Sequence, residues 1–139
     1  MIREHALQIR VRYAETDQMQ YVYYGHYAQY FEIGRTDLIR SLGITYRQME
    51  DDWGVMLPVR KLEVQYRKPA RYDDLLKIVS RVEEVPLASI RILHEVYLLE
   101  DDKETLLATG MVELVFVDKA NMRPIRTPQA FLDALLTKS

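Results

Sequence analysis

A polar loop ahead of a helical pattern carries the side chains best suited to chemistry. The segment from Tyr13 to Tyr27 reads YAETDQMQYVYYGHY and contains two carboxylates, Glu15 and Asp17. A carboxylate here could act as a nucleophile or as a general base for water. The first N–H groups of a following helix have no acceptor within the helix and lie at the positive end of its dipole. They could stabilise the charge on a carbonyl oxygen under attack, so the segment suits acyl transfer.

The same residues also have a purely structural interpretation. Acidic side chains before a helix commonly cap it or form a solvated turn. His26, in the expected first turn, could be a second base or a donor to substrate, and could equally be a surface residue. The three histidines show no ligand spacing and the chain has no cysteine. We therefore expect no metal site, disulfide or cysteine nucleophile.

Two hydrophobic periods frame the loop expected from Glu15 to Gln20. Residues 7–13 alternate with period two, which predicts a half-buried strand. From Tyr24 to Leu42 the period is helical, ending at Gly43 as the C′ residue. One stripe of this helix holds Tyr27, Tyr30, Phe31, Gly34 and Leu38. A glycine inside the stripe predicts the close approach of another backbone.

Strands dominate the rest of the chain. A short helix is expected from Thr45 to Trp53, because Thr45 and Gln48 have the spacing of a capping box. Strands are expected at 57–67, 74–85, 89–99 and 105–118, with residues 100–103 as a hairpin loop. A last helix should take Thr127 as N-cap and Pro128 as N1, and end near Leu136. This order predicts one α+β domain over 1–139, with an antiparallel sheet packed against the long helix.

The net charge and the distribution of apolar residues argue against a nucleic-acid-binding protein and against a membrane-spanning one. The chain has 139 residues, 48 % of them apolar, and a net charge of −2. That charge gives no electrostatic footprint for nucleic acid. No stretch approaches the roughly 20 apolar residues of a membrane span, and the N-terminus lacks the apolar run of a signal peptide. We therefore expect a cytoplasmic protein.

The segment from Tyr13 to Tyr27 resembles the opening motif of the hotdog-fold acyl-CoA thioesterases related to 4-hydroxybenzoyl-CoA thioesterase. The matching pattern is Y-x-E-T-D-x-x-x-x-V-Y-Y-x-x-Y, and the likeness continues through residues 31–36 and 66–74. The resemblance implies a curved antiparallel sheet wrapped around one long central helix. It also implies hydrolysis of an acyl-CoA thioester with no cofactor, since CoA is part of the substrate. Two subunits would pair with their active sites at the interface, and a further pairing into tetramers stays open.

By position, the resemblance makes Asp17 the catalytic carboxylate and Tyr24 the residue whose backbone N–H polarises the thioester carbonyl. Asp17 would either attack the carbonyl to form an anhydride or activate a water, and both routes stay open. We expect the substrate to be bound by Tyr13, Gln20, Gly25, His26, Val59, Arg60 and Lys61. Arg67, Lys68 and Arg71 could add positive charge for the CoA phosphates.

Two departures from the family pattern keep an alternative open. Gln20 and Tyr21 stand where the family commonly has a glycine. Residues 86–88 read Pro-Leu-Ala where some members carry a basic run for the CoA phosphates. Both differences favour a non-catalytic acyl-CoA-binding or sensor protein on the same fold.

Overall fold

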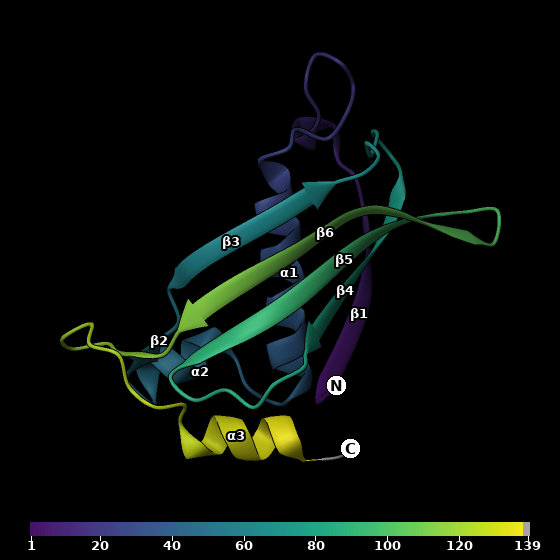
Figure 1. Cartoon of the computed structure of the whole chain (residues 1–139). Coiled ribbons are helices and arrows are strands. Elements are labelled where there is room, and N and C mark those ends of the chain that lie inside the picture. Colours follow the sequence, from purple (N-terminus) through teal and green to yellow (C-terminus); the bar gives the residue numbers. More distant parts are fainter. Residues whose placement is uncertain (138–139) are drawn as a thin grey trace.

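The computed structural model describes residues 1–137 (Figure 1). The expected domain of 1–139 includes Lys138 and Ser139, which lie outside the described residues. In chain order the described elements are β1 (Arg3–Arg10), the 3-10 helix η1 (Tyr13–Glu15), α1 (His26–Ser41), α2 (Tyr46–Asp51), β2 (Val55–Met56), β3 (Val59–Tyr66), β4 (Leu75–Val82), β5 (Ser89–Glu100), β6 (Lys103–Val115), β7 (Val117–Asp118) and α3 (Gln129–Leu136).

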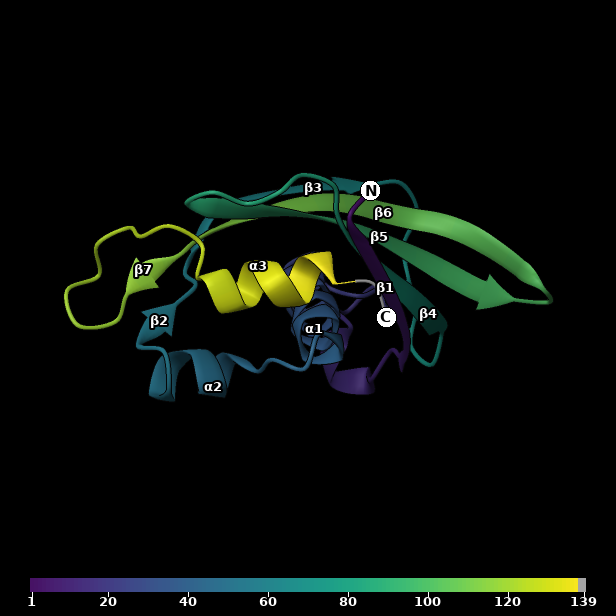
Figure 2. The ribbon, with the colours of Figure 1, turned by 90° about the horizontal axis from the view of Figure 1, so that it is seen from below.

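A curved sheet wraps around the long helix. Its strands follow the order β1-β4-β5-β6-β3, and every neighbouring pair is antiparallel. Figure 2 shows α1 and α3 lying under the concave face of the sheet. The short strands β2 and β7 pair with each other. The predicted architecture, a curved antiparallel sheet around one long helix, is confirmed.

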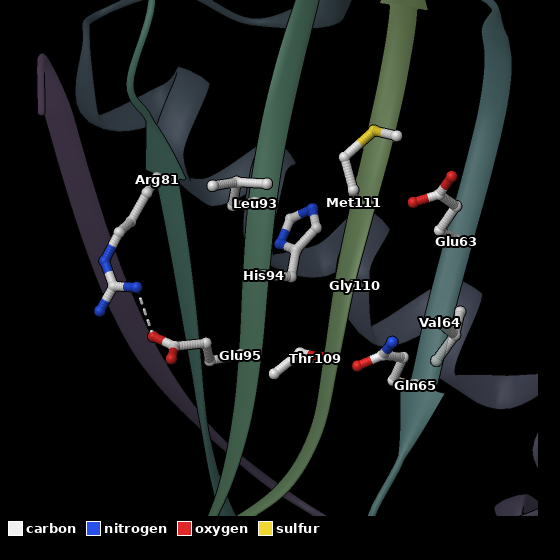
Figure 3. Close-up of a pocket in the computed structure, with 10 residues that line it drawn as sticks. All are labelled: Glu63, Val64, Gln65, Arg81, Leu93, His94, Glu95, Thr109, Gly110 and Met111. Carbon is white, nitrogen blue, oxygen red and sulfur yellow. Dashed lines mark ion pairs between the residues drawn. The ribbon is translucent and has the colours of Figure 1, made fainter.

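The convex face of the sheet carries a groove of about 580 Å³ (Figure 3). Both charged and apolar side chains line the groove. Arg81 forms an ion pair with Glu95 at 2.6 Å, and Leu93 and Met111 lie beside them. Side chains alternate between the two faces of a strand, so the intervening residues point the other way, into the core.

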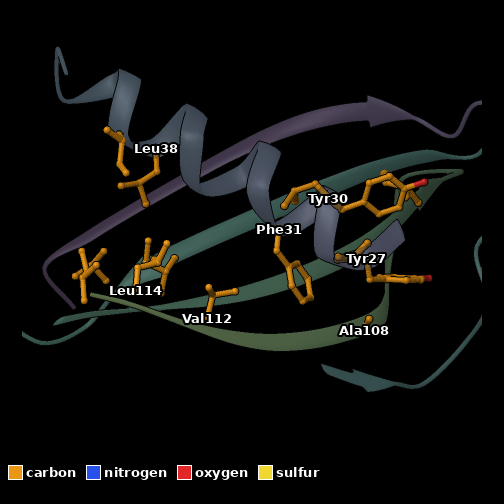
Figure 4. Close-up of a cluster of buried hydrophobic side chains, with 14 of the residues drawn as sticks. Tyr27, Tyr30, Phe31, Leu38, Ala108, Val112 and Leu114 are labelled. Atoms are coloured by element: carbon orange, nitrogen blue, oxygen red, sulfur yellow. The ribbon is translucent and has the colours of Figure 1, made fainter. Parts of the chain in front are cut away.

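The core lies between α1 and the concave face (Figure 4). All five members of the predicted stripe are buried. A Cβ at Gly34 would lie 2.6 Å from Ser80 Oγ and 2.8 Å from Ile78 Cγ2. The sequence predicted the close approach of another backbone, and that is wrong, because the atoms that crowd Gly34 belong to side chains of β4. Gly110 of β6 similarly leaves room for the ring of Phe31.

A histidine is buried in this core. The ring of His94 stacks on Phe31 with centroids 4.7 Å apart, and its Nδ1 lies 2.9 Å from Ser80 Oγ. Burial lowers the pKa of His94 to about 3, with the charge of Arg35 acting in the same direction. His94 is therefore neutral near pH 7 and acts as a packed core residue.

Several element boundaries differ from the predictions. The first strand is Arg3–Arg10 rather than 7–13, and the long helix begins at His26 rather than Tyr24. The last helix takes Pro128, not Thr127, as N-cap, because the Thr127 hydroxyl donates to the Leu87 carbonyl at 2.6 Å. The last predicted strand, 105–118, is divided into β6 and β7, which pair in different sheets.

Other local predictions hold. Thr45 Oγ1 accepts a hydrogen bond from the Gln48 N–H at 3.0 Å and caps α2. Gly43 follows α1 with φ of +85°. The hairpin between β5 and β6 turns at Asp101 and Asp102, which both have positive φ, as a type I′ turn requires.

The two ends of the described chain are tied together. The guanidinium of Arg3 in β1 donates to the carbonyls of Ala134 at 3.1 Å and Leu135 at 2.9 Å, near the end of α3. Carbonyls in the last turn of a helix receive no hydrogen bond from an N–H of the helix, so the arginine supplies the missing donor. Among residues 1–137, no helix is both long and apolar enough to cross a membrane.

Candidate active site

The two carboxylates of the loop have different surroundings. Glu15 is buried and accepts hydrogen bonds from the Arg12 N–H at 2.9 Å and the Tyr30 hydroxyl at 3.0 Å. The Arg12 guanidinium adds a bond of 3.1 Å. Burial alone would raise the pKa of Glu15, but the hydrogen bonds from Arg12 and Tyr30 hold that pKa below its usual value. Glu15 thus joins the loop to α1 and is not available to a substrate.

Asp17 is exposed and lies in a tight turn. Its N–H donates to the Tyr21 carbonyl at 2.8 Å, and its carbonyl accepts from the Gln20 N–H at 2.9 Å. Carboxylate Oδ1 accepts from the Met19 N–H at 2.8 Å. Within residues 1–137, Oδ2 accepts no hydrogen bond, so one carboxylate oxygen is free for chemistry. The structure therefore favours Asp17 over Glu15 as the reactive carboxylate.

The turn requires a left-handed residue at Gln20, whose φ is +68°. Glycine adopts this conformation without a steric penalty, whereas a side chain makes it less favourable. This accounts physically for the glycine that the resembling family commonly has here. The backbone conformation of the turn is thus formed without that glycine.

The start of α1 presents unpaired donors. Gly25 is the N-cap, the His26 N–H donates to the Tyr23 carbonyl at 2.9 Å, and the Tyr27 N–H donates to the Tyr24 carbonyl at 3.3 Å. In the part of the chain that the structure describes, no backbone carbonyl accepts from the N–H of Tyr24 or Gly25. Gly25 is the N-cap, and the first N–H groups of a helix have no acceptor within it.

A pocket of about 310 Å³ brings the carboxylate and the helix start together. Its lining includes Asp17, Tyr24, Tyr27, Tyr66 and Lys68. The loop is held against this lining by hydrogen-bonded bridges: the Val22 N–H donates to the Ala70 carbonyl at 2.8 Å, and Tyr21 pairs with Arg71. The segment after β3 therefore forms one wall of the pocket.

A second pocket, of about 690 Å³, is also lined by Asp17. It is lined by Tyr13, Thr16, Asp17, Gln18, Gln20 and Tyr72. The rings of Tyr13 and Tyr72 meet edge to face, with centroids 5.6 Å apart. Asp17 thus lines two pockets.

The structure brings some of the predicted site residues together. Tyr13 and Gln20 share the larger pocket with Asp17, and Tyr24 shares the smaller one. Gly25 adjoins Tyr24 at the helix start. His26 lies along the helix, with its Nδ1 2.8 Å from Gln29 Oε1, and lines neither pocket.

Three predicted substrate-binding residues lie away from both pockets. Val59, Arg60 and Lys61 are at the opposite end of β3 from Tyr66 and line neither pocket. Arg60 pairs with Glu113 at 3.0 Å and Lys61 with Glu63 at 3.0 Å. Within one copy of the chain, these residues do not reach Asp17.

The sequence also left some lining residues unassigned. Tyr27 was predicted only as a member of the helical stripe, and Tyr66 was given no role of its own, yet both line the smaller pocket. The available signal was the Tyr66-Arg67-Lys68 run after the strand, which lies within the resembling segment. Among residues 1–137, no group of three or more His, Asp or Glu side chains is placed to hold a metal ion.

Comparisons with known proteins agree with this geometry. The thioesterase-like superfamily matches residues 11–135. The acyl-CoA thioesterase YbgC of Haemophilus influenzae is 31 % identical over 121 residues, which are 87 % of this chain and 86 % of YbgC. The solved structure of the DHNA-CoA thioesterase from Staphylococcus aureus is 35 % identical, covers 88 % of this chain and 80 % of its own, and superimposes with a TM-score of 0.81.

A more distant structure supports the fold alone. The 4-hydroxybenzoyl CoA thioesterase in complex with 4-hydroxybenzoyl CoA has a TM-score of 0.88 at 20 % identity, covering 96 % of this chain and 99 % of its own. The fold is therefore the hotdog fold of thioesterases. The chain belongs to the thioesterase-like superfamily.

Proposed function

We propose that this protein is an acyl-CoA thioesterase in which Asp17 is the catalytic carboxylate. The observation that carries the proposal is the shared pocket: the carboxylate of Asp17 and Tyr24 at the helix start line one cavity. The relatives named above support the substrate class, because two of them are CoA thioesterases.

The reaction would use both parts of the pocket. The thioester carbonyl oxygen would accept hydrogen bonds from the N–H of Tyr24 or Gly25, which stabilise the oxyanion as the carbonyl is attacked. Asp17 would attack the carbonyl carbon, giving an anhydride that water then hydrolyses, or would take a proton from an attacking water. In both routes the C–S bond breaks, and CoA leaves as a thiolate that takes up a proton. No metal or cofactor enters either route.

Positive charge for the CoA phosphates is available beside the smaller pocket. Arg67 and Lys68 follow β3 and line its wall, and both are exposed. Charge-assisted hydrogen bonds from such side chains suit phosphate oxygens. This supports the earlier expectation for these two residues.

We propose that the functional unit is a homodimer formed through the free edge of β3. Val59, Leu62 and Tyr66 are 44–50 % exposed along this edge. Strand edges of this kind readily pair with another chain. An antiparallel pairing centred near Glu63 would bring Arg60 and Lys61 of a second copy toward the Tyr66 end of the first. Their predicted role in substrate binding would then be supplied across the interface.

The decisive experiment measures thiol release from short, long and aromatic acyl-CoAs by wild-type protein and Asp17→Asn. The variant keeps the hydrogen-bond acceptor of the turn but removes the charge, so turnover should fall well over tenfold while the melting temperature is retained. Asp102→Asn, in the remote β5–β6 hairpin, is the matched control and should be fully active. An Asp17→Asn rate above about a tenth of wild type, which is only ~1.4 kcal/mol of barrier, contradicts the assignment.

The second candidate function is an acyl-CoA-binding protein without hydrolysis. The side chain at Gln20, in the lining of the larger pocket, favours it. It predicts that acyl-CoA binds and is recovered intact.

Three other expectations have their own tests. Sedimentation of the purified protein tests the proposed dimer, and cell fractionation tests the expected cytoplasmic location. Dialysis against a chelator tests whether hydrolysis needs a metal.

A further inference from the structure

A tyrosine of the edge strand reaches the helix start. The hydroxyl of Tyr66, the last residue of β3, donates to the carbonyl of Tyr24 at 3.0 Å. Its ring meets that of Tyr27 edge to face, with centroids 5.2 Å apart, and that of Tyr24 with centroids 6.5 Å apart. The side chain is 50 % exposed, so its place is not explained by core packing.

The accepting carbonyl belongs to a peptide group of the site. The Tyr24 carbonyl and the Gly25 N–H are the two ends of one planar trans peptide, so they point in opposite directions. A backbone donor to the same carbonyl, the Tyr27 N–H, is farther away at 3.3 Å. Because Tyr66 makes the shorter bond, it contributes strongly to the orientation of the Gly25 N–H.

The same bond changes the strength of the donor. A hydrogen bond accepted by an amide carbonyl polarises the amide, and its N–H becomes a better donor. Burial raises the pKa of Tyr66, and the neighbouring Tyr24 acts in the same direction. Tyr66 therefore keeps its proton, and remains a donor, across neutral and mildly alkaline pH.

We propose that Tyr66 is a positioning residue of the oxyanion site, which holds and polarises the Tyr24–Gly25 peptide through its hydroxyl. This rests on the proposed thioester hydrolysis. Tyr66 does not touch the reacting atoms in this role; it acts through the Gly25 N–H. The inference links the edge strand to the chemistry at the helix start.

The test removes one oxygen atom and keeps the ring. Tyr66→Phe should lower kcat by about three- to tenfold with KM changed less than about twofold, because the lost polarisation matters most when the oxyanion forms. Tyr97→Phe, the same deletion on β5 away from the pocket, is the control and should leave both constants unchanged. A rise in KM alone, or no change in kcat, overturns the proposal.

A spectroscopic measurement separates this role from a structural one. Benzoyl-CoA with a ¹³C-labelled carbonyl is bound to Asp17→Asn, with and without Tyr66→Phe, and the carbonyl stretch is followed by infrared difference spectroscopy. Binding should lower the stretching frequency, and Tyr66→Phe should reduce that shift. An equal shift in both proteins overturns the inference.

The two proposals fail in different ways. If wild-type protein binds acyl-CoA without hydrolysing it, the proposed function fails, and the infrared shift still decides the role of Tyr66. If Asp17→Asn is inactive while Tyr66→Phe keeps full kcat, the proposed function stands and the positioning role is wrong.

Discussion

The core under α1 and the loop around Asp17 are built in different ways. In the core, Phe31 and Leu38 are fully buried, and Gly34 lets the helix approach β4 closely (Figure 4). Around Asp17 the side chains are exposed, Tyr24 by 64 %, and Gln20 takes a left-handed conformation. Apolar burial holds the first region, whereas backbone hydrogen bonds and a turn hold the second.

A side-chain hydrogen bond connects the two regions. Tyr30 is a fully buried residue of the core, and its hydroxyl donates to Glu15 at the base of the loop. The position of Asp17 therefore depends on the core through a short chain of bonds, while little of the core's stability depends on the loop. Changes in the two regions should consequently separate stability from activity.

The largest expected effect is on the core. Phe31→Ala removes a buried ring that stacks on His94, and it should lower the free energy of unfolding by about 3–5 kcal/mol. Tyr24→Ala removes an exposed ring and should cost less than about 1.5 kcal/mol. Urea unfolding of both variants measures the difference. Equal losses would show that the two regions do not differ as described.

Acidification should lower the free energy of unfolding through groups in both regions, and the loss per pH unit should be smaller than the loss from Phe31→Ala. His94 has a folded pKa of about 3 against an ordinary value of 6.5, so its contribution to stability is complete above pH 6.5 and is lost as the pH falls toward 3. The pKa of Glu15 is also lowered, so its contribution is present above about pH 4.5 and is lost below. The free energy of unfolding should fall with acidification, by at most about 1.4 kcal/mol per pH unit from each group.

Denaturant unfolding from pH 7 to pH 5 isolates the histidine. In this range His94→Gln should flatten the pH dependence, while Glu15→Gln should leave its slope nearly unchanged. An unaltered slope in His94→Gln would mean that the buried ring is not the titrating group.

The smallest effect is expected in the turn. Gln20→Gly relieves the left-handed conformation and should raise the free energy of unfolding by up to about 1 kcal/mol, with thioester hydrolysis retained. Asp102→Gly, at a φ of +63° in the remote hairpin, is the matched control and should stabilise to a similar degree. Calorimetry and the thiol-release assay measure both, and a destabilised Gln20→Gly would contradict the steric argument.

The sequence predicted features that depend on local spacing. The buried stripe of α1 and the C′ glycine follow from helical periodicity and backbone sterics. The crowding at Gly34 was expected from a backbone but comes from side chains of β4, which helical periodicity does not specify. The start of β1 did not follow, because its inward positions near the N-terminus are polar. His5 lies 2.6 Å from Asp37 of α1 and Arg3 bonds to α3, so hydrophobic alternation gives no signal there.

The candidate site was predictable only in part. Asp17 and Tyr24 came from the motif, and the structure places both on one pocket. The burial of Glu15 and the reach of Tyr66 depend on contacts between residues 15 and 42 positions apart, which periodicity does not encode. Arg60 and Lys61 lie at the end of β3 remote from Tyr66, and the proposed pairing of two copies through the free edge of β3 is what would bring them toward the site.

The bond from Arg3 to the end of α3 has a practical consequence for engineering. It brings both ends of the described chain to the bottom of Figure 1, whereas the Asp17 loop lies at the top. An affinity tag or a surface linker at either end would therefore leave the pocket that Asp17 lines open to solvent. A short peptide joining the two ends should also permit a circular permutant that opens at the Asp101–Asp102 turn.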